Sequence, residues 1–126
     1  MTAPAPGSVG WLDLTVEEAP RLRDFYSAVV GWKPEEVPMA GYSDYVMTDA
    51  ASGEPRAGVC HARGANAGLP AAWLVYVVVA DLGASLASAR ALGGEVIAEP
   101  REMGTDRYAV LRDPAGAPFA LWQKGA

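Results

Sequence analysis

The sequence predicts an α+β domain made of two tandem modules, each with the element order βαβββ. The chain matches itself at an offset of 63 residues. Each half opens with an alternating strand pattern, continues as a helix pattern that stops at glycine, and ends with three short extended segments. A chain of 126 residues has the size of one compact domain. We therefore expect one domain over residues 1–126, with modules at about 8–63 and 71–124 and a linker at 64–70.

The internal repeat is informative because its identities coincide with turns and element ends. Glycine and proline fix turn geometry, so their recurrence at a constant offset favours duplication over chance. The matched pairs are Val16/Val79, Ala28/Ala91, Gly31/Gly94, Gly41/Gly104, Tyr45/Tyr108, Gly53/Gly116, Pro55/Pro118 and Ala57/Ala120.

The first module begins with an alternating strand over residues 9–16. A helix follows, with Pro20 in its first turn and a stop at Gly31, which favours a left-handed cap. Its apolar stripe consists of Leu22, Phe25, Tyr26 and Val29. Extended segments are expected around residues 34–37, 44–49 and 56–61, and the small residues after them indicate the linker.

The second module repeats this order, beginning with a strand over residues 73–79. Asp81 is the expected N-cap of the second helix, which stops at Gly93 and Gly94. The helix stripe consists of Leu82, Leu86, Ala89 and Leu92, and the expected strands lie around residues 95–100, 107–112 and 118–123.

Composition excludes several classes of function. A net charge of −5 disfavours nucleic acid and anionic lipid as partners. The longest apolar run, residues 71–80, is about half of the roughly 20 residues that span a membrane. Cys60 is the single cysteine, and residues 1–6 lack the pattern of a signal peptide, so we expect a cytoplasmic protein. The richness in Ala, Gly and Arg is typical of a bacterial source.

Three stretches together resemble a known superfamily: "LDLTVEEAPRLRDFYSAVVGW", "YVVVADLGASLASARALGGEVIAEP" and "YAVLRDPAGAPFALWQ". They resemble the modules of the vicinal oxygen chelate superfamily, which includes glyoxalase I, bleomycin resistance proteins and extradiol dioxygenases. The resemblance covers residues 9–123 and implies a cupped mixed sheet with the helices on its outer face. It also implies a divalent metal held by the first and last strands of each module, although the fold hosts metal-free binders as well.

The residues at the implied metal positions carry no suitable donors. Alternation on the first strand turns Trp11, Asp13 and Thr15 toward the cup. The resemblance then maps the four ligands onto Trp11, Leu74, Ala57 and Ala120. Divalent ions need converging oxygen, nitrogen or sulfur donors, so we expect no metal, no cofactor and no metal-dependent glyoxalase or dioxygenase activity.

Few other side chains could carry a reaction. Asp13 is a candidate general base, because a carboxylate facing a cup is partly desolvated; the alternative is that it is simply hydrogen-bonded to Thr15, Tyr76 or water. His61 is expected to be an edge or surface residue. Cys60 and His61 are adjacent on one strand, so their side chains should point to opposite faces and form no reactive pair.

An aromatic set on the inward side is the strongest binding signal. Rings with polar edges suit a planar or hydrophobic small molecule, but they also occur in cores and dimer interfaces. The expected ligand-binding residues are Trp11, Asp13, Tyr45, Tyr76, Tyr108 and Trp122.

Three functions remain open at this point. The first is a metal-free protein, similar to bleomycin resistance proteins, that binds a small hydrophobic or aromatic molecule. The second is a lyase, isomerase or dioxygenase-type enzyme of the same superfamily with a non-standard site, in which Asp13 or a tyrosine handles protons. The third is an interaction module whose cup is filled or covered. The resemblance also implies a homodimer.

Overall fold

The computed structural model describes residues 5–125, which form eight strands and two α-helices in the predicted βαβββ order, repeated once. The chain divides into two compact units. We call Leu12–Trp73 the α1 unit, and the segment up to Trp11 together with the chain from Leu74 onward the α2 unit. The elements are β1 (Val9–Val16), α1 (Ala19–Val30), β2 (Lys33–Pro38), β3 (Ser43–Thr48), β4 (Pro55–His61), β5 (Trp73–Val78), α2 (Leu82–Ala91), β6 (Glu95–Met103), β7 (Asp106–Arg112) and β8 (Pro118–Gln123).

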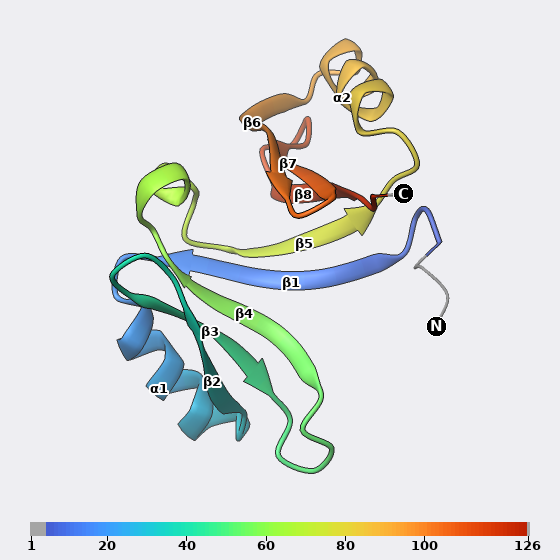
Figure 1. The fold of residues 1–126 in the computed structure, drawn as a ribbon. Helices are drawn as coiled ribbons and strands as arrows, with labels where there is room; N and C mark the ends of the chain where they lie inside the picture. Colours follow the sequence, from blue (N-terminus) through green and yellow to red (C-terminus); the bar gives the residue numbers. More distant parts are fainter. Residues whose placement is uncertain (1–4, 126) are drawn as a thin grey trace. The chain divides into compact units, whose positions relative to one another are not determined.

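The α1 unit is a mixed sheet with α1 on one face. The strand order is β2-β3-β4-β1, with β1 parallel to β4 and the other pairs antiparallel. The helix contacts β2, β3 and β4, beside which it lies in Figure 1. Pro20 lies in its first turn, and Gly31 ends it with a φ of 84°, as the sequence predicts.

Aromatic packing stabilises the α1 unit. The indole N–H of Trp73 donates to the Tyr26 hydroxyl at 2.9 Å, and the two rings meet edge to face with centroids 5.1 Å apart. Trp32 packs against both rings. These side chains surround a buried cluster of Ala19, Tyr45, Met47 and Val59, so α1 is fixed to the sheet through apolar contacts.

The α2 unit has the same architecture, with strand order β5-β8-β7-β6 and α2 against β6, β7 and β8 (Figure 1). Asp81 caps α2 by accepting the backbone N–H of Ala84 at 3.0 Å, which confirms the predicted N-cap. Leu82 and Leu86 of the helix pack against Ala109, Leu111 and Leu121. Within residues 5–125, neither α-helix is long and apolar enough to cross a membrane.

Two expectations about the α1 unit are wrong. Tyr45 is 6% exposed and packs in the cluster beneath α1, not on the opposite side. Ala57 pairs with Met47 of the same cluster, so it also lies on the helix side. Gly58 takes the place that corresponds to Ala120.

The length of one connection explains both errors. Val46 and Gly58 are paired across β3 and β4, whereas the corresponding pair across β7 and β8 is Val110 and Ala120. The chain between paired residues is two residues longer in the α1 unit, and a register irregularity follows Met47. A constant offset therefore fails in β3 and β4, and a slip of one residue moves a side chain to the other face.

Candidate functional site

The face of the α2 unit that points away from α2 is formed by two rows of side chains, which we call the aromatic face. Directly paired residues project to the same side of a sheet, so the register defines each row. One row crosses the sheet as Val78, Trp122, Tyr108 and Arg101, and the next as Tyr76, Ala120, Val110 and Ala98.

Two tyrosines meet on this face. The rings of Tyr76 and Tyr108 have centroids 6.1 Å apart and planes inclined by 48°. Tyr76 is almost fully buried, whereas Tyr108 is half-buried. Ala120 and Ala98 beside them carry only methyl groups and are buried. The half-buried ring of Tyr108 therefore offers accessible apolar area with a polar edge.

Trp122 is held in position along its edge. Its indole N–H donates to a carboxylate oxygen of Asp106 at 3.0 Å, and the ammonium of Lys124 lies 5.1 Å from its ring centroid. Asp106 also accepts the backbone N–H of Gly125 at 2.8 Å and the Lys124 ammonium at 3.3 Å. The pKa of Asp106 is lowered chiefly by the hydrogen bond from the Gly125 N–H, and then by those from Trp122 and Lys124. This carboxylate is therefore ionised, and the three donors compensate its negative charge.

Gly10 makes room for the same indole. A Cβ atom at this position would lie 2.7 Å from two ring carbons of Trp122 and 3.1 Å from a methyl carbon of Val78. Those distances are below ordinary carbon contacts, so only glycine lets this part of β1 pack against the ring.

The corresponding face of the α1 unit is polar. The row that crosses β1, β4 and β3 there consists of Thr15, Cys60 and Asp44, and Asp13 lies on the same face of β1, two residues before Thr15. The Cys60 thiol lies 3.6 Å from both carboxylate oxygens of Asp13 and donates to them. Burial, and then the charge of Asp13, raise the pKa of Cys60 far above its usual range. The thiol is therefore a neutral donor and not a nucleophile.

Asp44 is a buried carboxylate beside His61, and the sequence analysis did not include it among the candidate site residues. It is 7% exposed, accepts the backbone N–H of His61 at 2.8 Å, and lies 3.2 Å from Nδ1 of the imidazole. The sequence signal was a lone carboxylate inside the apolar strand around Tyr45. His61 is therefore half-buried and has a carboxylate partner. The sequence analysis expected a surface or edge residue and did not predict this partner.

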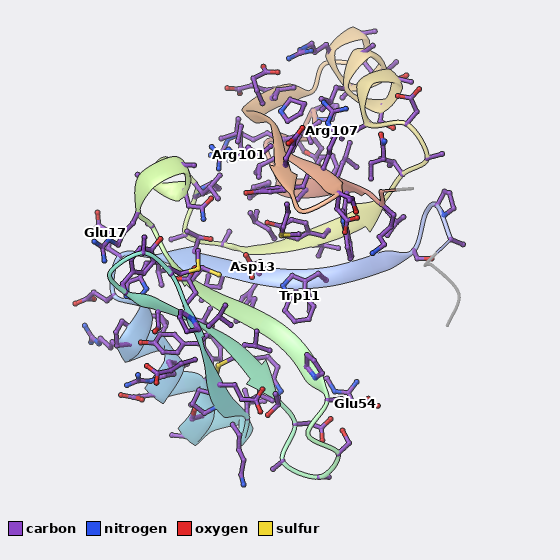
Figure 2. The ribbon with its side chains drawn as sticks, in the orientation of Figure 1. Trp11, Asp13, Glu17, Glu54, Arg101 and Arg107 are labelled. Atoms are coloured by element: carbon purple, nitrogen blue, oxygen red, sulfur yellow. The ribbon has the colours of Figure 1, made fainter. Side chains whose placement is uncertain are left out.

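The structure brings together three of the expected binding residues: Tyr76, Tyr108 and Trp122 share the aromatic face. Trp11 and Asp13 both extend from β1, as Figure 2 shows, and they belong to the α2 and α1 units respectively. Arg101, which comes from β6 and lies beside Tyr108, was not among the expected binding residues. The sequence predicted a strand around residues 95–100, which ends before Arg101, whereas β6 continues to Met103.

The residues at the implied metal positions do not fit a divalent ion. Leu74 and Ala120 are fully buried and have hydrocarbon side chains without donor atoms. Trp11 carries an indole, and Gly58 has no side chain. Across residues 5–125, no three His, Cys, Asp or Glu side chains are grouped so that they could hold a metal. The donor set thus offers neither the oxygen and nitrogen ligands of a magnesium or calcium site nor the nitrogen and sulfur ligands of a zinc site.

Comparisons with known proteins agree with this architecture. The model of the Glyoxalase/Bleomycin resistance protein/Dioxygenase superfamily matches residues 8–121. The anthracycline biosynthesis protein DnrV of Streptomyces peucetius is 35% identical, with 99% of this chain aligned to 50% of that protein. CFP32 of Mycobacterium tuberculosis is 36% identical, with 91% of this chain aligned to 43% of it. The chain thus spans about half the length of these curated relatives or less.

A solved structure shows the same fold. Methylmalonyl-CoA epimerase of Streptomyces coelicolor superposes with a TM-score of 0.57 at 17% identity, over 97% of this chain and 100% of that one. At this level of identity the likeness extends to the fold alone.

Proposed function

The chain belongs to the glyoxalase/bleomycin resistance protein/dioxygenase superfamily, and on that premise we propose that it binds a planar aromatic small molecule on its aromatic face without a metal. The observation that carries this proposal is the grouping of Tyr76, Tyr108 and Trp122 beside the small side chain of Ala120. Flat rings with polar edges stack well on planar ligands, and the partly exposed rings of Tyr108 and Trp122 are the parts of this face that a ligand can reach.

The names of two relatives support a polycyclic ligand. DnrV and DauV are both described as anthracycline biosynthesis proteins. Anthracyclines contain fused planar rings, whose shape suits the half-buried face of Tyr108. We therefore propose a fused-ring aromatic molecule as the ligand class.

Equilibrium dialysis against a neutral fused-ring probe, anthraquinone-2-carboxamide, tests the proposal. Loss of the stacking ring in Tyr108→Ala should weaken binding by about three- to tenfold. Tyr42→Ala is the matched control, because Tyr42 is a partly exposed tyrosine in the α1 unit. No saturable binding to the wild type, or equal weakening by both substitutions, would contradict the proposal.

A second candidate function rests on the polar face of the α1 unit. Asp13 accepts from the Cys60 thiol, so it is a carboxylate held in a fixed position on a strand. Such a group could remove a proton from a carbon acid, which is the chemistry of an isomerase or lyase. Deuterium incorporation into a bound carbonyl compound in D₂O, followed by NMR, should then occur with the wild type and cease in Asp13→Asn. Exchange that persists in this variant would exclude Asp13 as the base.

We also propose that the protein forms a homodimer and resides in the cytoplasm. Phe25, Val29 and Val30 on α1 are at least half exposed, and a second copy could cover this apolar strip. Sedimentation equilibrium should give twice the mass of one chain for the wild type and a lower mass for Phe25→Glu. A monomeric wild type at micromolar concentration would refute the dimer.

The single cysteine supports a reducing compartment such as the cytoplasm.

A further inference from the structure

An arginine lies at the end of the aromatic row. Arg101 of β6 is paired directly with Tyr108 of β7, and Tyr108 is paired with Trp122 of β8. Directly opposed side chains in antiparallel strands have Cβ atoms roughly 5 Å apart and project to the same side. The guanidinium therefore belongs to the face that carries the rings, in a chain whose net charge is −5.

We propose that Arg101 makes this site selective for a planar aromatic acid, with the carboxylate or ionised phenol of the ligand on the guanidinium and its rings over Tyr108. This inference rests on the proposed function and names its ligand class more closely. A guanidinium carries five N–H donors in a planar fork, which matches the two oxygens of a carboxylate. With five donors, it can hold a protein partner and a ligand oxygen together.

Asp106, which lies beside this row, does not oppose an anionic ligand. Asp106 already accepts the Trp122 indole N–H, the Gly125 backbone N–H and the Lys124 ammonium. Its charge is therefore offset by donors of the same unit. The guanidinium of Arg101 places a positive charge at one end of the row, and a positive charge attracts an anion.

A second arginine of the same hairpin provides a matched control. Arg107 is paired with Glu102, one position along from the pair of Arg101 and Tyr108. Successive side chains of a strand point to opposite faces, so Arg107 projects away from the aromatic face. Figure 2 shows that both arginines come from the β6–β7 hairpin. They carry the same charge and differ in the face to which they project.

The experiment compares two probes of equal shape, anthraquinone-2-carboxylate and anthraquinone-2-carboxamide, by isothermal titration calorimetry. The wild type should bind the acid roughly tenfold more tightly than the amide, as expected for one charge-assisted contact at a half-exposed site. Arg101→Gln should reduce this preference to about twofold or less, because the affinity for the acid falls much more than the affinity for the amide. Arg107→Gln should retain the wild-type preference.

The outcomes separate the two proposals. Equal affinity for acid and amide in the wild type would overturn the selectivity and leave the aromatic site standing. Absence of binding by both probes would overturn the proposed function and the selectivity together. Equal loss of preference in Arg101→Gln and Arg107→Gln would show a general charge effect and overturn the role of Arg101. If Arg101→Gln does not fold, Arg101→Lys replaces it, because lysine retains the charge but lacks the planar set of donors of a guanidinium. This variant should prefer the acid over the amide by a factor between those of the wild type and of a variant without the charge.

Discussion

Gly10→Ala should destabilise the α2 unit because the new methyl group would overlap the indole of Trp122. A Cβ atom at Gly10 would lie 2.7 Å from two ring carbons, against roughly 3.5 Å for an ordinary carbon contact. The ring would have to turn, and turning strains its hydrogen bond to Asp106. Overpacking of this kind costs about 1–3 kcal/mol, and weakening a bond to a charged acceptor adds to it, so we expect a loss of about 2–4 kcal/mol in the free energy of unfolding.

Urea unfolding followed by circular dichroism measures this loss, and thermal unfolding should show a melting temperature lower by roughly 10 °C. Gly68→Ala is the control, because a Cβ atom at Gly68 would have no other atom within 4 Å. That variant should stay within about 0.5 kcal/mol of the wild type. The packing argument is refuted if Gly10→Ala unfolds at the same urea concentration as the wild type.

Three further predictions concern the core and the titratable groups. Leu82→Ala should lower the free energy of unfolding by about 3 kcal/mol in urea titrations, because the side chain is fully buried; a change under 1 kcal/mol would contradict this. Cys60 should react with a thiol reagent at pH 8 far more slowly in the native protein than in urea, since burial and a neighbouring carboxylate raise its pKa; equal rates would contradict its burial. The pKa of Asp106 is lowered in the folded state, chiefly by the Gly125 N–H, so its stabilisation is complete above the unfolded-state pKa of 3.8 and is lost as pH falls through the folded pKa. Asp106→Asn should therefore be less stable than the wild type at pH 7, and this difference should shrink in melting curves below about pH 4; a constant difference would contradict the assignment.

Part of the candidate site could be predicted because side-chain alternation is local. In the α2 unit, the sequence placed Tyr76, Tyr108 and Trp122 on the face away from the helix, and the strand register puts all three there. The helix limits at Gly31 and Asp81 were equally predictable, since left-handed glycine caps and N-cap carboxylates depend on adjacent residues. Nothing beyond a few neighbouring residues is needed to infer the alternation along one strand or the ends of a helix.

Other parts of the site depend on how distant strands pair. The sequence offset predicted that Tyr45 and Ala57 would correspond to Tyr108 and Ala120, but the longer connection between β3 and β4 places both on the helix side. The same register brings Asp44 beside His61.

The amino-acid sequence by itself determined the two βαβββ repeats and the helix ends, because periodicity and capping are local properties. The tertiary structure alone decided the strand register, and with it the pairing of Arg101 with Tyr108 and the approach of Asp13 to Cys60. Register is set by turn lengths and by packing between distant segments, and a shift of one residue exchanges the two faces of a strand.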